Sequence, residues 1–67
     1  MIKNRLKEIL ESRGIKQVWL AEKVGVTRQT MSNLINNRFE PSLGLVFRIC
    51  EVLNSKIDDV FYNDNKS

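Results

Sequence analysis

The sequence has no histidine, and its 67 residues include only one cysteine and one proline. One cysteine cannot form an intramolecular disulfide, and the usual zinc ligand sets need more cysteine and histidine than this chain has. We therefore expect a reduced, cytoplasmic protein that depends on its apolar core and holds no metal or other cofactor. An enzyme is not expected either, because the chain lacks both a histidine base and a glycine-rich phosphate loop.

Long hydrophobic runs are also missing. No stretch approaches the roughly 20 apolar residues that cross a bilayer, and charged residues interrupt the opening segment MIKNRLKEIL. We expect neither a membrane span nor a signal peptide, and no membrane partner. The length predicts a single domain over residues 1–62 and a frayed tail over residues 63–67, without a further domain for a small-molecule ligand.

Positive charge is in excess only in the first part of the chain. The formal net charge is +3. Residues 1–39 carry eight Lys and Arg against three Glu, a net +5, whereas residues 40–67 carry three Lys and Arg against five acidic residues, a net −2. A basic N-terminal part favours a polyanionic partner such as nucleic acid. Because small domains often carry a few net charges, the charge by itself favours this only slightly.

Apolar residues recur at helical spacing in several segments, and no segment alternates as an exposed strand would. Gly14, Gly25 and Asn37 are placed to end the first three helices in the left-handed conformation. Cys50 falls on the buried face of the fourth. The pattern predicts an all-α fold of five short helices around one core. The predicted helices are residues 2–13, 17–24, 28–35 and 42–53, and a short one that turns Ile57, Val60 and Phe61 inward.

Residues 26–37, VTRQTMSNLINN, combine an apolar stripe with an unusual outer face. With about 100° per residue, Met31 and Leu34 set the buried direction and the polar side chains point away from it. Neither Glu nor Lys occurs between Gly25 and Arg38, although both are common on solvated helices. Arg, Gln, Asn and Ser suit the edges of bases, so this face is a candidate for DNA recognition, with simple solvation as the alternative. The outward residues are Arg28, Gln29, Ser32, Asn33 and Asn36.

Two residues at the starts of helices bear on this face. Thr27 can cap the third helix, because its side-chain oxygen can accept a free N–H of the first turn. Gln17 begins the second helix and leans toward the third, where its amide could brace Gln29 or reach a phosphate. The alternative for Gln17 is an ordinary polar residue at a helix start.

The run QVWLAEKVGVTRQTMSNLIN resembles the helix-turn-helix of the phage repressor and Cro family, also called the XRE family. The similarity extends over nearly the whole chain, from about Lys3 to Phe61, since the later runs RFEPSLGL and KIDDVF also resemble the family's last helices. The matching positions are Gln17, Leu20, Ala21, Gly25, Val26, Thr27, Gln29, Met31, Ser32, Leu34 and Asn36.

This resemblance implies a sequence-specific regulator of transcription, with repression as the expected sign, that places its third helix in the major groove of double-stranded DNA. It further implies a homodimer on a near-palindromic operator, with half-sites roughly 34 Å apart. Thr27, Arg28, Gln29 and Asn33 would face base edges, and Thr30 and Ser32 would complete the groove face. Gln17, Asn36 and Arg38 would bind backbone phosphates. The family's dimer contacts usually come from the fourth and fifth helices and the chain end.

Several positions depart from the family pattern. Lys16 replaces the usual Thr or Ser cap of the second helix, and Asn37 replaces the usual Gly. Ile35 leaves an apolar group near the end of the third helix. Trp19 projects away from its helix's buried side, and either lies flat over neighbouring aliphatic stems or contacts a partner. The candidate dimer or partner contacts are therefore Phe47, Trp19 and Ile35.

A rival function follows from these apolar residues. The same fold could serve as a protein-interaction module or an antitoxin, which would bind a protein rather than DNA. The dependence of DNA affinity on salt separates the two hypotheses, because DNA binding releases counterions and weakens steeply as salt rises.

Overall fold

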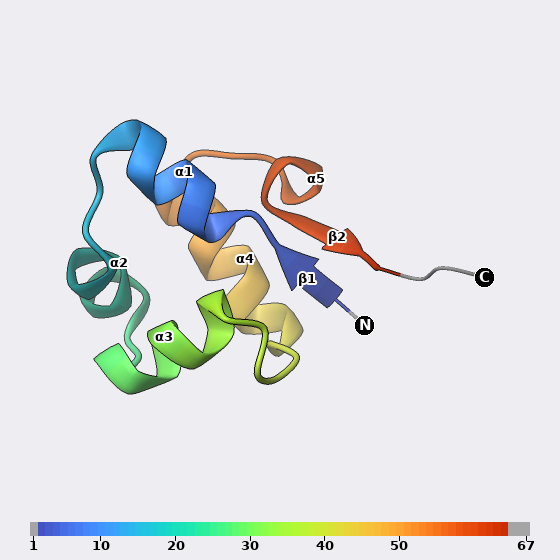
Figure 1. The fold of residues 1–67 in the computed structure, drawn as a ribbon, viewed down its shortest axis with the longest axis horizontal. Helices are drawn as coiled ribbons and strands as arrows, with labels where there is room; N and C mark the ends of the chain where they lie inside the picture. The colour runs from blue at the N-terminus through green and yellow to red at the C-terminus, as the bar shows by residue number, and fades with distance from the viewer. Residues whose placement is uncertain (1, 65–67) are drawn as a thin grey trace.

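Helix α3 lies across one end of the molecule, with α2 beside it and α4 running behind the core (Figure 1). The computed structural model describes residues 2–64. It confirms the predicted mostly helical fold with a helix-turn-helix at its second and third helices. None of the described helices is long and apolar enough to cross a membrane. The elements are β1 (Ile2–Asn4), α1 (Leu6–Arg13), α2 (Gln17–Val24), α3 (Arg28–Ile35), α4 (Leu43–Val52), α5 (Ile57–Val60) and β2 (Phe61–Asn63).

Local side-chain chemistry sets the ends of the helices. Thr27 caps α3 by accepting a hydrogen bond from the Thr30 N–H at 3.0 Å, and Ser42 caps α4 in the same way. Among the described residues, Lys16 provides no side-chain cap for α2, as a lysine there predicts. Asn37 adopts the predicted left-handed conformation with φ of 58°, which ends α3.

One apolar cluster joins all the helices. Its fully buried side chains come from α1, α2, α3, α4 and α5, so no helix is independent of the others. Cys50 is buried on α4 as predicted, and this burial raises the pKa of its thiol above the ordinary value, which keeps the thiol protonated at neutral pH. The largest fully buried side chains are those of Leu6, Leu20, Met31, Leu34, Ile49 and Val60.

The predicted first helix was wrong over residues 2–4, which form a strand. Strands β1 and β2 pair antiparallel, with Ile2 opposite Asn63 and Asn4 opposite Phe61. The backbone N–H of Leu6 donates to Asn4 Oδ1 at 3.0 Å, so the chain turns at Asn4 before α1 begins. Helical spacing of apolar residues could not reveal this, because the strand's partner lies at the other end of the chain.

The C-terminal segment is also more ordered than predicted. Phe61 is buried as expected, but it begins β2 rather than extending the last helix. Asn63 ends β2, and Asp64 Oδ2 lies 3.1 Å from Lys3 Nζ, so these two residues of the predicted tail are structured. Residues 65–67 of that predicted tail lie outside the described residues.

Ile35 requires a second correction. It is only 6% exposed and belongs to the core cluster, so it is not available as a dimer or partner contact. Met31, Leu34 and Ile35 form an i, i+3, i+4 stripe, and an apolar stripe that faces a core spans 100° or more. The buried face predicted from the sequence was too narrow, because Met31 and Leu34 alone defined its direction.

Replacing Ile35 with Ala should therefore lower the free energy of unfolding by about 2–5 kcal/mol, since it removes buried methyl groups and leaves a cavity. Urea denaturation measures this effect. Leu43→Ala is the matched control, because Leu43 is 67% exposed and its truncation should change stability by less than about 0.5 kcal/mol. Equal effects of the two substitutions would contradict the burial of Ile35.

Candidate nucleic-acid interface

A groove of about 590 Å³ lies between the N-terminal parts of α2 and α3. Gln17 stands on its α2 side and Gln29 on its α3 side, so Gln17 does lean toward the third helix as its position in the sequence predicts. The groove is open to solvent and mostly polar in character. Its lining residues are Lys16, Gln17, Val18, Arg28, Gln29 and Ser32.

The outward face of α3 is uncharged apart from its first residue. Arg28, Gln29 and Asn36 are exposed, whereas Ser32 and Asn33 are half-buried. This is the surface that the angular argument derived, with Met31 and Leu34 buried behind it. The exposure of these side chains agrees with the prediction, and their contacts with bases and phosphates stay predictions.

Asn33 is the centre of a hydrogen-bonded group on this face. Its Oδ1 accepts from Gln29 Nε2 at 3.1 Å and from Arg38 Nη1 at 3.2 Å. Both bonds use the amide oxygen, and the Nδ2 hydrogens of Asn33 donate to no other described side chain. Asn33 therefore offers donors to a ligand, and the two neighbours hold its amide in one orientation.

Other side chains on the face are held by their own helix. Asn36 Nδ2 donates to the Ser32 carbonyl at 2.9 Å, which folds the Asn36 amide back along α3. Thr27 Oγ1 donates to Thr30 Oγ1 at 2.9 Å in addition to capping the helix. These bonds reduce the number of side-chain conformations that a ligand would have to fix on binding.

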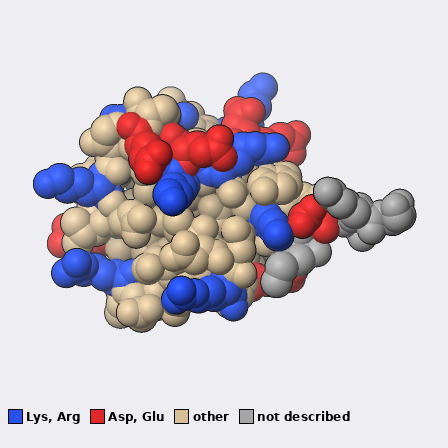
Figure 2. Space-filling view, viewed as in Figure 1, with Lys and Arg blue, Asp and Glu red and all other residues tan. Residues whose placement is uncertain are grey.

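Charge is distributed unevenly around the face. Figure 2 shows Lys and Arg side chains along the lower edge, over α3, whereas at the upper edge, over α1 and α5, acidic side chains gather among further Lys and Arg. No Asp or Glu occurs from Lys23 to Phe39, and Arg28 and Arg38 stand near the two ends of α3. A polyanion would meet cations at the rim of this face and neutral amides in its middle.

Comparison with known proteins places this arrangement in a family. A helix-turn-helix family model matches residues 6–60, from the start of α1 to the end of α5. The chain belongs to the XRE family of helix-turn-helix proteins. The match confirms the resemblance carried by the α2–α3 sequence. The matched segment begins after β1 and ends before β2, so the strand pair lies outside it.

Similar proteins extend over nearly the full chain. "Uncharacterized HTH-type transcriptional regulator YgzD" of Bacillus subtilis (strain 168) is 38% identical over 66 residues, which covers 98% of this chain and 100% of the relative. "Uncharacterized HTH-type transcriptional regulator MJ0272" of Methanocaldococcus jannaschii is also 38% identical over 66 residues, with 97% and 100% covered. A crystal structure of a "putative DNA-binding protein" from Bacteroides fragilis superposes with a TM-score of 0.82 at 31% identity and covers 92% of this chain and 100% of the other.

Two groove residues were missed by the sequence argument for this XRE-family chain. Lys16 was considered only as a poor helix cap, yet it lines the groove beside Gln17. Its position directly before α2 was the available signal, because free N–H groups at a helix start attract anions and a cation adds to that attraction. Val18 also lines the groove, and nothing in its apolar character could have indicated this.

The exposed aromatic residues lie away from the groove. Trp19 is 42% exposed, beside a shallow hollow formed with Gly14 and Ile15, and Lys23 Nζ is 5.6 Å from its ring centroid. This contact with Lys23 supports the first interpretation, in which Trp19 covers neighbouring stems, although the residue remains exposed enough to contact a partner. Phe47 on α4 is 52% exposed. Partner contacts at both aromatic residues stay predictions.

Thr27→Ala should lower the free energy of unfolding by about 1 kcal/mol, because the substitution removes the side-chain acceptor for the Thr30 N–H at the start of α3. Chemical denaturation gives the difference. Thr27→Ser keeps a hydroxyl and should retain most of the stability. If the Ser and Ala variants were equally unstable, the hydrogen bond would not be the stabilising feature of Thr27.

Proposed function

We propose that the chain is a sequence-specific DNA-binding regulator of transcription that reads the major groove with α3. Membership of the XRE family supports a DNA-binding transcription regulator, and the similar proteins in two organisms carry names of that kind. The observation that carries the finer proposal is the uncharged polar face of α3, beside a groove that Gln17 and Lys16 complete. Repression is the proposed sign of regulation, on the basis of the family resemblance.

The chemistry of this face suits base edges. In the proposed complex Thr27, Arg28, Gln29 and Asn33 contact bases. Gln29 keeps its Oε1 acceptor and one Nε2 hydrogen after bonding Asn33, which is the pair that a bidentate contact with adenine requires. Asn33, with its oxygen already in use, is suited to acceptors such as guanine O6 or thymine O4. The Thr30 methyl and the Ser32 hydroxyl complete the surface, against a thymine methyl and neighbouring acceptors.

Contacts with the DNA backbone are proposed for Gln17, Asn36 and Arg38. All three side chains are exposed and lie at the ends of the recognition surface. Lys16 adds a cation to the same rim, next to the first N–H groups of α2. Phosphate contacts of this kind orient a protein on the duplex and supply most of its sequence-independent affinity.

A homodimer on a near-palindromic operator is the proposed assembly. Helix α4 supports it, because Phe47 and Leu43 are exposed apolar residues four positions apart on one helix face. Exposed aromatic side chains of this kind are enriched at protein interfaces. Two copies related by a two-fold axis would present two α3 helices to successive major grooves.

The rival function is a protein-interaction module or an antitoxin with the same fold. The exposure of Trp19 and Val18 on α2 supports it, since neither side chain is needed by the core. Titration with duplex DNA at several salt concentrations decides between them. Affinity that falls steeply with salt supports DNA binding, and absent DNA binding favours the rival.

Gln29→Ala should cost about 1–3 kcal/mol at one base position of a selected site and relax the base preference there. Arg38→Ala should weaken binding to all sequences alike and reduce the slope of log affinity against log salt by about 1. Asn33 retains its bond from Gln29 in the Arg38 variant, so its amide stays oriented. Selection from a random DNA pool, followed by competition titrations, measures both effects. An unchanged preferred sequence for Gln29→Ala would refute the proposed recognition face.

Phe47→Ser should weaken self-association by about 1–3 kcal/mol, or roughly 5- to 150-fold in the dimer dissociation constant, because it truncates an apolar contact. Analytical ultracentrifugation measures the constant, and stability of the monomer should hardly change at so exposed a position. Trp19→Ser is the matched control on α2 and should leave self-association intact. If Trp19→Ser weakened self-association and Phe47→Ser did not, the dimer surface would lie on α2 rather than on α4.

A further inference from the structure

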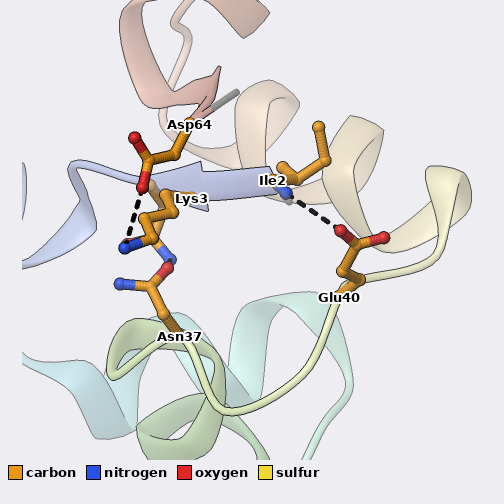
Figure 3. A network of polar contacts seen from close by, with 6 residues as sticks. Ile2, Lys3, Asn37, Glu40 and Asp64 are labelled. Atoms are coloured by element: carbon orange, nitrogen blue, oxygen red, sulfur yellow. Dashed lines mark hydrogen bonds and ion pairs between the residues drawn. The ribbon is translucent and has the colours of Figure 1, made fainter. Parts of the chain in front are cut away.

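The first and last described strands, β1 and β2, pair near the C-terminal end of α3. Strand β1 pairs with β2, and on its other side β1 lies next to the segment that leaves α3 (Figure 3). Lys3 Nζ bonds Asp64 Oδ2 at 3.1 Å, and the Ile2 N–H donates to Glu40 Oε1 at 3.0 Å. Figure 3 shows Asn37 and Glu40 facing β1 from the loop. The strand pair is therefore in contact with the loop that follows the recognition helix.

Asn4 makes the central contacts of this junction. Its Nδ2 donates to the Leu34 carbonyl at 2.9 Å and lies 3.3 Å from Asn37 Oδ1, while its Oδ1 accepts from the Leu6 N–H at 3.0 Å. All the polar atoms of the side chain are thus in use, in a half-buried position. One amide therefore bridges the start of α1, one carbonyl in the last turn of α3 and the residue that ends α3.

Both ends of α3 are closed by local hydrogen bonds, and the C-terminal end is in addition bonded by a residue from β1. Thr27 caps the N-terminal end from within the same segment. At the C-terminal end, the Asn37 N–H donates to the Leu34 carbonyl and the Arg38 N–H to the Asn33 carbonyl, both at 2.9 Å, and Asn4 Nδ2 adds a bond to the Leu34 carbonyl from β1. Asn33 and Asn36 are on this last turn, so a shift of the turn would move both.

We propose that Asn4 is a positioning residue for DNA recognition, which holds the last turn of α3 at the angle that Asn33 needs to reach a base. This inference rests on the proposed function, because Asn4 affects DNA only through the bases that α3 is proposed to contact. A recognition side chain must be held within about 0.5 Å of its productive position to discriminate between bases. Non-specific binding to phosphates tolerates a larger displacement, so the two kinds of affinity should respond differently to the loss of Asn4.

Asn4→Ser tests the inference. A serine hydroxyl can still accept from the Leu6 N–H, but it is one bond too short to bridge to the Leu34 carbonyl and Asn37. The ratio of specific to non-specific DNA affinity should fall about tenfold, as two lost hydrogen bonds predict, with non-specific affinity unchanged within about twofold. The loss of base preference should be larger at the position assigned to Asn33 than at that of Gln29.

Asn37→Gly is the second variant, which removes only the weaker bond. Its backbone, with φ of 58°, suits glycine, so the fold should be retained and the ratio should fall by about two- to threefold. Cys50→Ala is the control for stability. Cys50 is buried on α4, so its truncation should lower the melting temperature without changing the ratio of specific to non-specific affinity. All titrations are made well below the lowest melting temperature of the series.

The outcomes separate the inference from the function on which it rests. If Asn4→Ser lost specific and non-specific affinity equally, or if its ratio matched that of Cys50→Ala, Asn4 would have a merely structural role. If Asn4→Ser did not fold, an unchanged ratio for Asn37→Gly would overturn the inference. If the unsubstituted protein bound no sequence preferentially, the proposed function would fail first, and the inference with it.

Discussion

The burial of one face of α3 is the constraint on which the rest of the molecule depends. Met31 and Leu34 are fully buried and Ile35 nearly so, and any rotation of the helix about its axis would bring part of this stripe into water. An eight-residue helix is not stable by itself, so tertiary packing both forms α3 and sets its orientation. Because the core alone fixes which side chains face outward, Gln29 and Asn33 are free to serve a ligand rather than the fold.

The two ends of α3 are held by different kinds of contact. The N-terminal end is held by a local contact, since Thr27 caps a helix that begins at the next residue. The C-terminal end also has local backbone bonds, but it is held in addition by Asn4, which belongs to a strand that forms only when residues 61–63 return to pair with it. Formation of the first turn therefore needs little of the chain, whereas the last turn reaches its final position only in the complete domain. The positions of side chains near the last turn, such as Asn33, therefore depend on the complete domain as well.

The same distinction decides how much could be predicted from the sequence. The cap at Thr27 and the left-handed residue Asn37 were predictable, because each depends on its neighbours along the chain. The outward face of α3 was predictable for the same reason, since all its members are on one helix. The strand at Ile2–Asn4 was not, because its spacing of apolar residues also fits a helix and its partner is remote. Lys16 lines the groove because of the way α2 and α3 cross, and the local sequence pattern does not reveal this crossing.

The distribution of charge bears on why the proposed assembly has two copies. Within α3 only Arg28 is charged, so the cations near the surface are Lys16, Arg28 and Arg38, and the neutral middle contributes discrimination rather than attraction. Each phosphate that a protein neutralises contributes about 0.9 to the slope of log affinity against log salt. Because Arg28 is assigned to a base, Lys16 and Arg38 give one copy two such contacts, hence a shallow dependence and weak binding, whereas two copies on one operator double the number of contacts. A dimer thus adds affinity without placing charge on the recognition face, where a lysine would attract every phosphate equally and reduce the preference for one sequence.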